Sequence, residues 1–252
     1  MVRGIDSFRE WFLGHEDQYV IIGGTACDLL MTSEGLDFRA TKDIDMVLIV
    51  EAVDAAFGRR FWEYVIQAGY EHRNKSTDEP QFYRFTNPVS KEYPTMIELF
   101  SRRQDMIALP DDAVLTPLPV DEDISSLSAI LLDDDYYDFL TNGTVRIAGI
   151  TILDALHMIP FKAKAWIDLT ERKSKGERID SRSIRKHKND VFRLTELINI
   201  ENVEISYLPE VVKADMSAFI ESMASEDIDL KQLGIRDKGK DEILEELRHI
   251  YA

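Results

Sequence analysis

Two acidic residues, Asp43 and Asp45, stand two positions apart where an apolar segment begins, and the segment continues over residues 46–50. Such a run is typical of a buried strand. Side chains alternate between the faces of a strand, so both carboxylates lie on one face, with Cα atoms about 7 Å apart at roughly 3.3 Å per residue. Two side chains at that spacing could share divalent cations about 3.5 to 4 Å apart. Because like charges repel strongly where water is scarce, bound cations would stabilise the pair.

A second feature, Gly23-Gly24-Thr25, has residue types that suit phosphate binding. It follows the apolar residues Tyr19–Ile22 and precedes an apolar segment through Met31, which predicts a strand, a tight turn and a helix. Two glycines let a phosphate approach the backbone closely, and the first N–H groups of a helix lack partners within the helix. The helix dipole also favours an anion there. We therefore expect the turn to hold a phosphate, with Thr25 capping the helix or touching that phosphate.

The chain from residue 19 to about 195 resembles the nucleotidyltransferase superfamily, which includes DNA polymerase β and the aminoglycoside nucleotidyltransferases. Within it, the pattern is most similar to the AbiEii-like toxin branch. The resemblance is carried first by IGGT at residues 22–25 and RATKDIDMVL at residues 39–48. An acid on a later strand, a lysine-containing helix at residues 161–169 and a basic segment ending in K-x-D at residues 188–190 complete it.

The resemblance implies roles for particular residues. The third acid of the family falls at Glu98, so Asp43, Asp45 and Glu98 would hold two Mg²⁺ ions, and Glu98 would accept the proton of the attacking hydroxyl or hold the ion that activates it. The residues implied in binding the nucleoside triphosphate come from the turn, the R-x-T motif and the later helices: Gly23, Gly24, Thr25, Arg39, Thr41, Lys162, Lys188 and Asp190. The acceptor hydroxyl would belong to tRNA in the toxin branch, whose type IV toxin–antitoxin systems add an antitoxin protein as a partner. It would belong to a small molecule in the antibiotic-modifying branch.

The residues by themselves leave other interpretations open. Glu98 could be an edge-strand acid that faces water. Lys162 could extend its side chain along a buried helix to reach water rather than bind the triphosphate. Lys164 could likewise either reach water or bind an anion. Lys188 and Asp190 could form an exposed helix cap.

Hydrophobic periodicity predicts the elements that would position these residues. We expect helices at residues 5–16 and 52–68, with Gly69 as a C-cap, and strands at residues 19–22, 43–50, 81–86 and 95–100. A connection containing three prolines should span residues 101–126, the acids at 133–135 should begin a helix, and a strand or hairpin should occupy residues 144–152. The pattern is helical from Leu153 onward. Together with the resemblance, it predicts an α/β nucleotidyltransferase core, with a mixed sheet flanked by helices, over residues 1–150 and a helical domain over residues 151–252.

Composition limits the other classes of function. The chain has 252 residues, is 44% hydrophobic and carries a net charge of −17, so it can bury two modest cores but lacks a surface broadly adapted to nucleic acid. Positive charge is local, because residues 171–190 contain eight Lys or Arg against four acids. This basic strip would suit a triphosphate or a polyanionic acceptor, or be a solvated helical hairpin. No apolar run of roughly 18 residues and no leader is present, so we expect a cytoplasmic protein without a membrane span.

The sequence lacks the residues or motifs that several other kinds of chemistry would need. The single cysteine, Cys27, falls within the predicted helix after the turn and is expected to be a small buried hydrophobe rather than a nucleophile. The five histidines are widely spaced and give no zinc pattern, and neither a P-loop nor a G-x-G-x-x-G motif occurs. The resemblance thus implies Mg²⁺-dependent transfer of a nucleoside monophosphate to an acceptor hydroxyl. A non-catalytic nucleotide-binding partner protein is the alternative from another class.

Overall fold

The computed structural model of the chain describes residues 2–71, 83–100, 130–131, 133–200, 203 and 205–252. Contacts divide the chain into two compact units, the first of residues 1–120 and 144–153 and the second of residues 121–143 and 154–252. The sequence predicted a single division at residue 150. The chain instead passes between the units three times, because the hairpin at 144–153 completes the sheet of the first unit while the helix before it groups with the second. The connection predicted at residues 101–126 and the start of the strand predicted at 81–86 lie outside the described residues.

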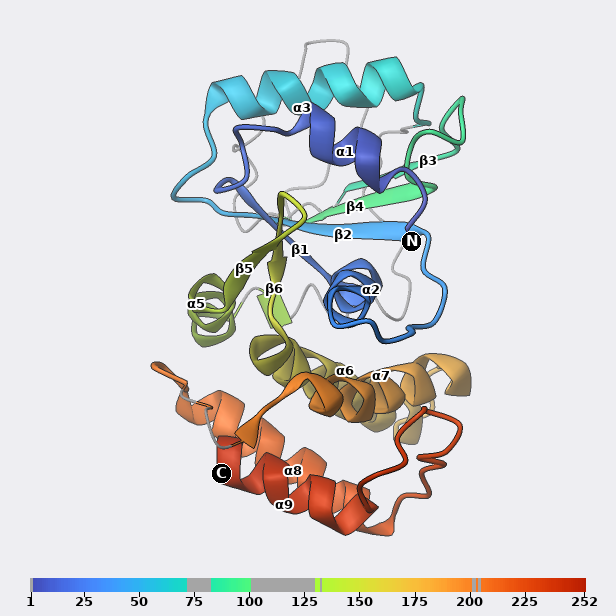
Figure 1. Cartoon of the computed structure of the whole chain (residues 1–252), viewed down its shortest axis with the longest axis vertical. Helices are drawn as coiled ribbons and strands as arrows, with labels where there is room; N and C mark the ends of the chain where they lie inside the picture. Colours follow the sequence, from blue (N-terminus) through green and yellow to red (C-terminus); the bar gives the residue numbers. More distant parts are fainter. Residues whose placement is uncertain (1, 72–82, 101–129, 132, 201–202, 204) are drawn as a thin grey trace. The chain divides into compact units, whose positions relative to one another are not determined.

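The first unit is built on a six-stranded mixed sheet (Figure 1). Its strands are β1 (Tyr19–Ile22), β2 (Asp43–Leu48), β3 (Tyr83–Thr86), β4 (Met96–Phe100), β5 (Thr144–Ile147) and β6 (Ile150–Leu153), in the order β3-β4-β2-β1-β6-β5. β2 is parallel to β4 and β1 to β6, and the other neighbours are antiparallel. The predicted mixed sheet is confirmed, and β4 is an interior strand.

Helices cover both faces of this sheet. Figure 1 shows α1 (Ile5–Trp11) and α3 (Ala55–Ala68) on one face and α2 (Gly23–Ser33) on the other. Aromatic rings fill the first interface, where the ring centroids of Phe8 in α1 and of its C-cap Phe12 lie 5.4 and 6.1 Å from that of Tyr19. Gly69 ends α3 at φ 61°, the left-handed C-cap that the sequence predicted. α1 is shorter than its predicted range of 5–16, because a turn follows in which Gly14 takes φ 87°.

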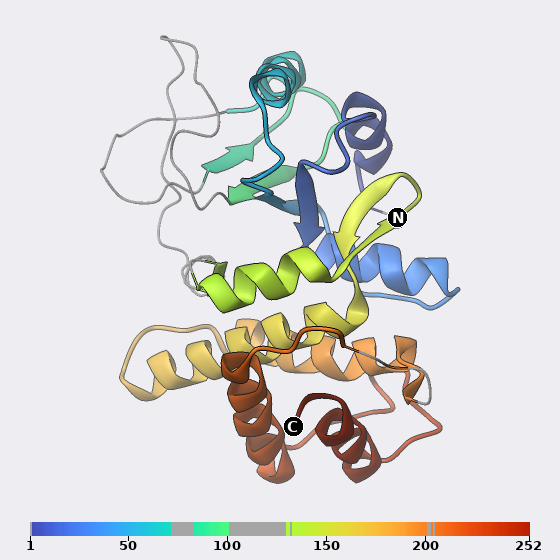
Figure 2. The same cartoon turned by 90° about the vertical axis from the view of Figure 1, so that its left-hand side faces the viewer.

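The second unit is helical, as predicted, and comprises α5 (Asp134–Asn142), α6 (Ala155–Ser174), α7 (Ser181–Leu194), α8 (Glu210–Ser225) and α9 (Lys240–Tyr251). Aspartates cap three of these helices: Asp133, Asp154 and Asp180 each accept a hydrogen bond from a backbone N–H in the first turn. The acids at 133–135 therefore begin a helix, as the sequence predicted. Figure 2 shows α8 and α9 crossing the α6–α7 pair within this unit.

The last helix, α9, is attached to α6 by a hydrogen bond to a backbone carbonyl that an internal proline leaves without its usual donor. Pro160 lies inside α6 and has no N–H to donate to the carbonyl of Leu156, one turn earlier. The buried hydroxyl of Tyr251 donates to that carbonyl instead, at 2.6 Å. In the part of the chain that the structure describes, no helix is both long enough and apolar enough to span a bilayer.

Candidate functional site

Three charged side chains form a row across the strands of the first unit. Asp45 on β2 is the register partner of Glu98 on the parallel strand β4, and Glu98 is the partner of Arg84 on the antiparallel strand β3. Register partners point to the same face of a sheet, so the three side chains are neighbours on one face. Arg84 donates from Nε to Oε1 of Glu98 at 2.8 Å, and its Nη2 lies 2.6 Å from the same oxygen. Two predicted acids and one basic residue thus share a single row.

Glu98 is buried, with 7% of its surface exposed. Burial, the charge of Asp45 and a hydrogen bond between the two carboxyl groups raise the pKa of Glu98 to about 8, against the opposing effect of Arg84. The carboxyl group therefore retains a proton at neutral pH as long as no further cation balances the pair. The interpretation of Glu98 as an edge-strand acid facing water is wrong, because β3 and β2 flank its strand.

The glycine turn packs directly against the acid row. β1 ends at Ile22 and α2 begins at Gly23, whose φ is 71°. A Cβ atom at Gly23 would lie 1.8 Å from Oδ2 of Asp45, so no residue with a side chain fits there without displacing the carboxylate. At Gly24 a Cβ would meet Oγ1 of Thr41 at 2.8 Å and Nη2 of Arg39 at 3.3 Å. The start of α2, a guanidinium and a hydroxyl therefore meet beside the carboxylates.

Two further predicted residues join the turn to the head of β2. Thr25 is completely buried, and its Oγ1 donates to the backbone carbonyl of Asp43 at 2.5 Å. This hydrogen bond links the first turn of α2 to the strand that carries both aspartates. The side chain of Asp43 is half-buried and lies on the same face of β2 as Asp45.

The donor set fits Mg²⁺. Carboxylate oxygens are its preferred protein ligands, and it is usually held by one or two carboxylates together with waters and substrate phosphates. Within the described residues, no group of three or more His, Cys, Asp or Glu side chains is close enough to hold a metal ion. The first unit therefore offers a pair of neighbouring carboxyl groups, Asp45 and Glu98, rather than a complete set of protein ligands around an ion.

Lys162, Lys188 and Asp190, the predicted site residues of the second unit, lie in ion pairs that are wholly or partly buried. Nζ of Lys162 on α6 lies 3.2 Å from Oδ2 of Asp190 on α7, with exposures of 5% and 0%. Lys188 is also buried and donates to Glu226 at 2.6 Å and to the carbonyl of Asp227 at 3.0 Å. The interpretation of Lys188 and Asp190 as an exposed helix cap is therefore wrong, because Asp190 meets α6 and Lys188 meets the residues that follow α8.

Lys164 is held by an acid rather than pointing freely to water. Its Nζ donates to Oδ1 of Asp215 at 2.9 Å, and the hydroxyl of Tyr136 donates to the other oxygen at 2.9 Å. This cluster joins α5, α6 and α8. Lys164 thus has a packing role within the second unit.

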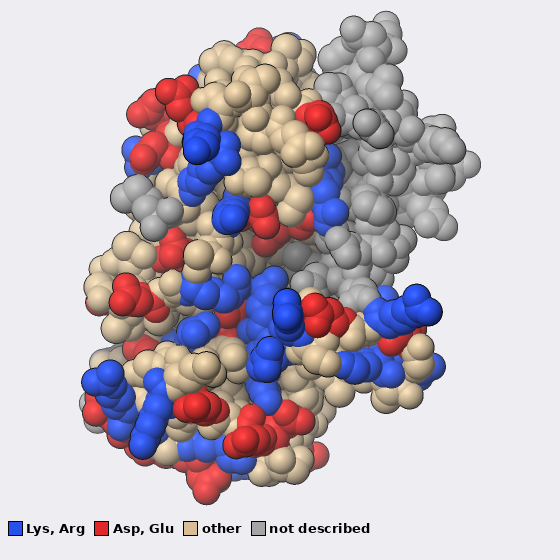
Figure 3. All heavy atoms as spheres, turned by 90° about the vertical axis from the view of Figure 1, so that its right-hand side faces the viewer, with Lys and Arg blue, Asp and Glu red and all other residues tan. Residues whose placement is uncertain are grey.

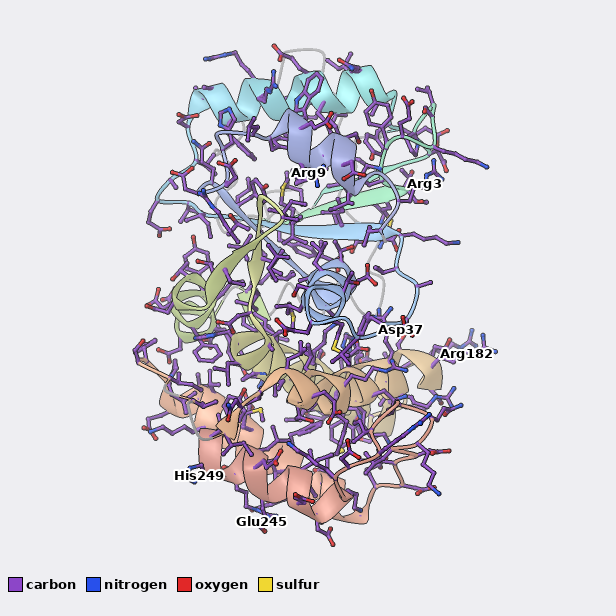
Figure 4. The ribbon with its side chains drawn as sticks, viewed as in Figure 1. Arg3, Arg9, Asp37, Arg182, Glu245 and His249 are labelled. Carbon is purple, nitrogen blue, oxygen red and sulfur yellow. The ribbon has the colours of Figure 1, made fainter. Side chains whose placement is uncertain are left out.

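Part of the basic strip is neutralised by its own acids. Arg172 pairs with Asp168 and Glu177, and Lys175 with Glu171. Three arginines at the end of the strip, Arg178, Arg182 and Arg185, are exposed, and none makes an ion pair with another described residue. Arg182 extends away from the start of α7 (Figure 4), and Lys and Arg gather among acids on the face of this unit seen in Figure 3.

Arg84 is the site residue that the sequence did not reveal. It lies between Tyr83 and Phe85 in the predicted strand, and Phe85 is buried against Phe61. A single cation in an alternating strand is ordinarily a solvent-facing residue. One signal in the sequence could have indicated its role. The strand of Arg84 comes directly before the strand of Glu98, and consecutive strands commonly pair.

Comparisons with known proteins add little to this geometry. No protein-family model matches the chain, and no curated protein matches it. Among solved structures it is similar to the crystal structure of an antigenic nucleotidyltransferase-like protein from Paracoccidioides brasiliensis, with 15% sequence identity, a TM-score of 0.40 and coverage of 89% of this chain and 87% of that chain. A TM-score of this size carries no argument, so the fold rests on the sheet order and register described above.

Proposed function

We propose that the protein is a Mg²⁺-dependent nucleotidyltransferase that transfers a nucleoside monophosphate from a nucleoside triphosphate to an acceptor hydroxyl. One observation carries the proposal: the carboxylate of Asp45 packs against Gly23 at the start of α2 while it pairs with Glu98. Transfer of a nucleotidyl group needs carboxylates for metal ions and N–H groups for phosphates within a few ångströms of each other. The first unit brings both together.

Each residue has a distinct role in this proposal. A Mg²⁺ ion bound with the triphosphate would neutralise charge on the phosphates and on the attacking oxygen. Asp43 and Asp45 supply carboxylate oxygens from one face of β2. Glu98 shares a proton with Asp45 and is placed to accept one from the acceptor hydroxyl once the pair is ionised.

The phosphate side of the proposed site is formed by the turn and the segment before β2. The first N–H groups of α2 lack partners within the helix, and Gly23 and Gly24 bring this stretch of backbone close to Asp45 and Thr41. Arg39 adds a guanidinium and Thr41 a hydroxyl at Gly24. A guanidinium offers paired N–H groups that match phosphate oxygens, so it would orient the triphosphate as well as attract it.

A polyanionic acceptor such as RNA is favoured over a small molecule by the exposed arginines of the second unit. Arg178, Arg182 and Arg185 have no acidic partner among the described residues, whereas Arg172 and Lys175 do. Contacts with nucleic-acid phosphates release counterions and make binding depend on salt. A toxin role on tRNA, with an antitoxin protein as partner, is part of this proposal through the family resemblance.

Ligand-induced stabilisation tests the proposed site. Wild-type protein at about 100 times the dissociation constant of Mg²⁺ and a triphosphate should gain about 2.7 kcal/mol, or roughly 5 to 10 °C in melting temperature. Asp45→Asn should lose most of this gain. Asp37→Asn is the matched control, because Asp37 is exposed in the loop between α2 and β2 (Figure 4). Equal stabilisation of Asp45→Asn and wild type by every triphosphate would overturn the proposal.

A further inference from the structure

The segment between α2 and β2 places an aromatic ring against the arginine of the proposed phosphate site. Residues 36–42 form neither helix nor strand, and Phe38 and Arg39 are both half-buried. The guanidinium carbon of Arg39 lies over the ring of Phe38, 5.2 Å from its centroid. Consecutive side chains point to opposite sides of an extended backbone, so this contact depends on the irregular path of the segment.

The same guanidinium reaches the glycine turn. Nη2 of Arg39 lies 3.3 Å from the position that a Cβ atom would take at Gly24. Gly24 belongs to the first turn of α2, where backbone N–H groups lack partners within the helix. Arg39 therefore lies over the ring of Phe38 and beside the start of α2 at once.

An aromatic ring holds a guanidinium in a different way from an acid. The face of the ring attracts a cation within about 6 Å of its centroid, but the ring is neutral and does not cancel the charge. The guanidinium of Arg84, in contrast, meets a carboxyl group of Glu98. An arginine side chain loses rotational freedom when a ligand fixes it, and a guanidinium that is already oriented loses less. The contact with Phe38 thus orients Arg39 without using up its charge.

We infer that Phe38 is a positioning residue for the triphosphate, because its ring holds the guanidinium of Arg39 beside Gly24. This inference rests on the proposed function and deepens it. Phe38 acts through Arg39 and does not itself touch the nucleotide. Loss of the ring should therefore weaken binding of the phosphates whatever base they carry, and only while Arg39 is present.

A double-mutant cycle on ligand binding tests this role. Isothermal titration calorimetry in Mg²⁺ compares wild type, Phe38→Leu, Phe38→Tyr, Arg39→Met and the double variant Phe38→Leu/Arg39→Met. The ligands are the nucleoside triphosphate that stabilises wild type most and inorganic tripolyphosphate, which has no base. We expect Phe38→Leu to bind both ligands about 3- to 10-fold more weakly than wild type, and Phe38→Tyr to stay within about 2-fold of it. In the Arg39→Met background, Phe38→Leu should cause no further loss.

Leu36→Ala is the matched control, because Leu36 is an exposed residue of the same segment, and this variant should bind as wild type does. Equal binding by Phe38→Leu and wild type, or the same loss in the Arg39→Met background, would overturn the inference and leave the proposed function standing. A loss for the nucleoside triphosphate but not for tripolyphosphate would also overturn it, because Phe38 would then contact the base.

Two further outcomes are decisive. A Phe38→Leu protein that does not fold would show that the ring supports the fold, and would overturn the inference alone. No binding of any nucleoside triphosphate by wild type would overturn the proposed function and this inference with it.

Discussion

Replacing Glu98 with glutamine should stabilise the metal-free protein, and the gain should grow with pH. In the folded chain the pKa of Glu98 is raised from 4.5 to about 8 by burial and by Asp45. An acid with a raised folded pKa binds more protons in the folded state than in the unfolded state between those values. The free energy of unfolding therefore falls as pH rises from about 4.5 to about 8.

The magnitude follows from the size of the pKa shift. Each pKa unit corresponds to about 1.4 kcal/mol, so wild type should lose about 2 to 4 kcal/mol between about pH 5.5 and pH 8. Glu98→Gln has no proton to lose in this range. Its amide oxygen can accept from Arg84 and its amide N–H can donate to Asp45, so the neighbouring groups stay paired.

Urea unfolding in EDTA at several pH values measures this difference. Glu98→Gln should exceed wild type by about 2 to 4 kcal/mol at about pH 8 and by less than about 1 kcal/mol at about pH 5.5. Glu63→Gln is the control, because Glu63 is exposed on α3, and it should follow wild type at every pH. Parallel curves for wild type and Glu98→Gln, or a less stable Glu98→Gln at about pH 8, would refute the electrostatic reasoning.

Three other substitutions test local parts of the structure. Gly23→Ala should abolish Mn²⁺ binding, measured by electron paramagnetic resonance, because the added Cβ would displace the carboxylate of Asp45. Gly14→Ala is the control, because Gly14 also has a positive φ but nothing lies within 4 Å of its added Cβ, so it should bind Mn²⁺ normally. Equal binding by both variants would contradict the close contact between Gly23 and Asp45. Tyr251→Phe should cost about 1 to 2 kcal/mol in urea unfolding, and less in a Pro160→Ala background, where an N–H restored to α6 bonds the Leu156 carbonyl. Additive effects of the two substitutions would refute the role of the hydrogen bond from Tyr251 to this carbonyl. Lys162→Met should cost about 3 to 5 kcal/mol, because it removes the cation from a buried aspartate, and a loss below about 1 kcal/mol would contradict the buried pair.

Local sequence patterns predicted much of the first unit. Period two placed Asp43 and Asp45 on one face of β2, and the apolar residues beside Glu98 predicted a strand. The Gly23-Gly24 pair predicted a turn that tolerates close approach. In each case the deciding interaction is short-range: alternation within a strand, or the conformational freedom of a residue without a side chain.

The features that the sequence did not reveal depend on contacts between distant elements. Arg84 reaches Glu98 only because of the register of β3 against β4. Lys162 and Asp190 pair only because α6 packs on α7, so a lysine that suits a phosphate in the sequence is held by an aspartate in the fold. Register and helix packing are set by the whole core, and no local period encodes them.

The central claim is transfer of a nucleoside monophosphate, and the position of the transferred label tests it most directly. Each nucleoside triphosphate, labelled separately at the α or the γ phosphate, is incubated with the protein, Mg²⁺ and total RNA, with Asp45→Asn in parallel. The proposed function predicts that one α label becomes covalently attached to RNA while the matching γ label leaves as pyrophosphate, and that Asp45→Asn does neither. Attachment of the γ label, or equal attachment of the α label by Asp45→Asn, would contradict it.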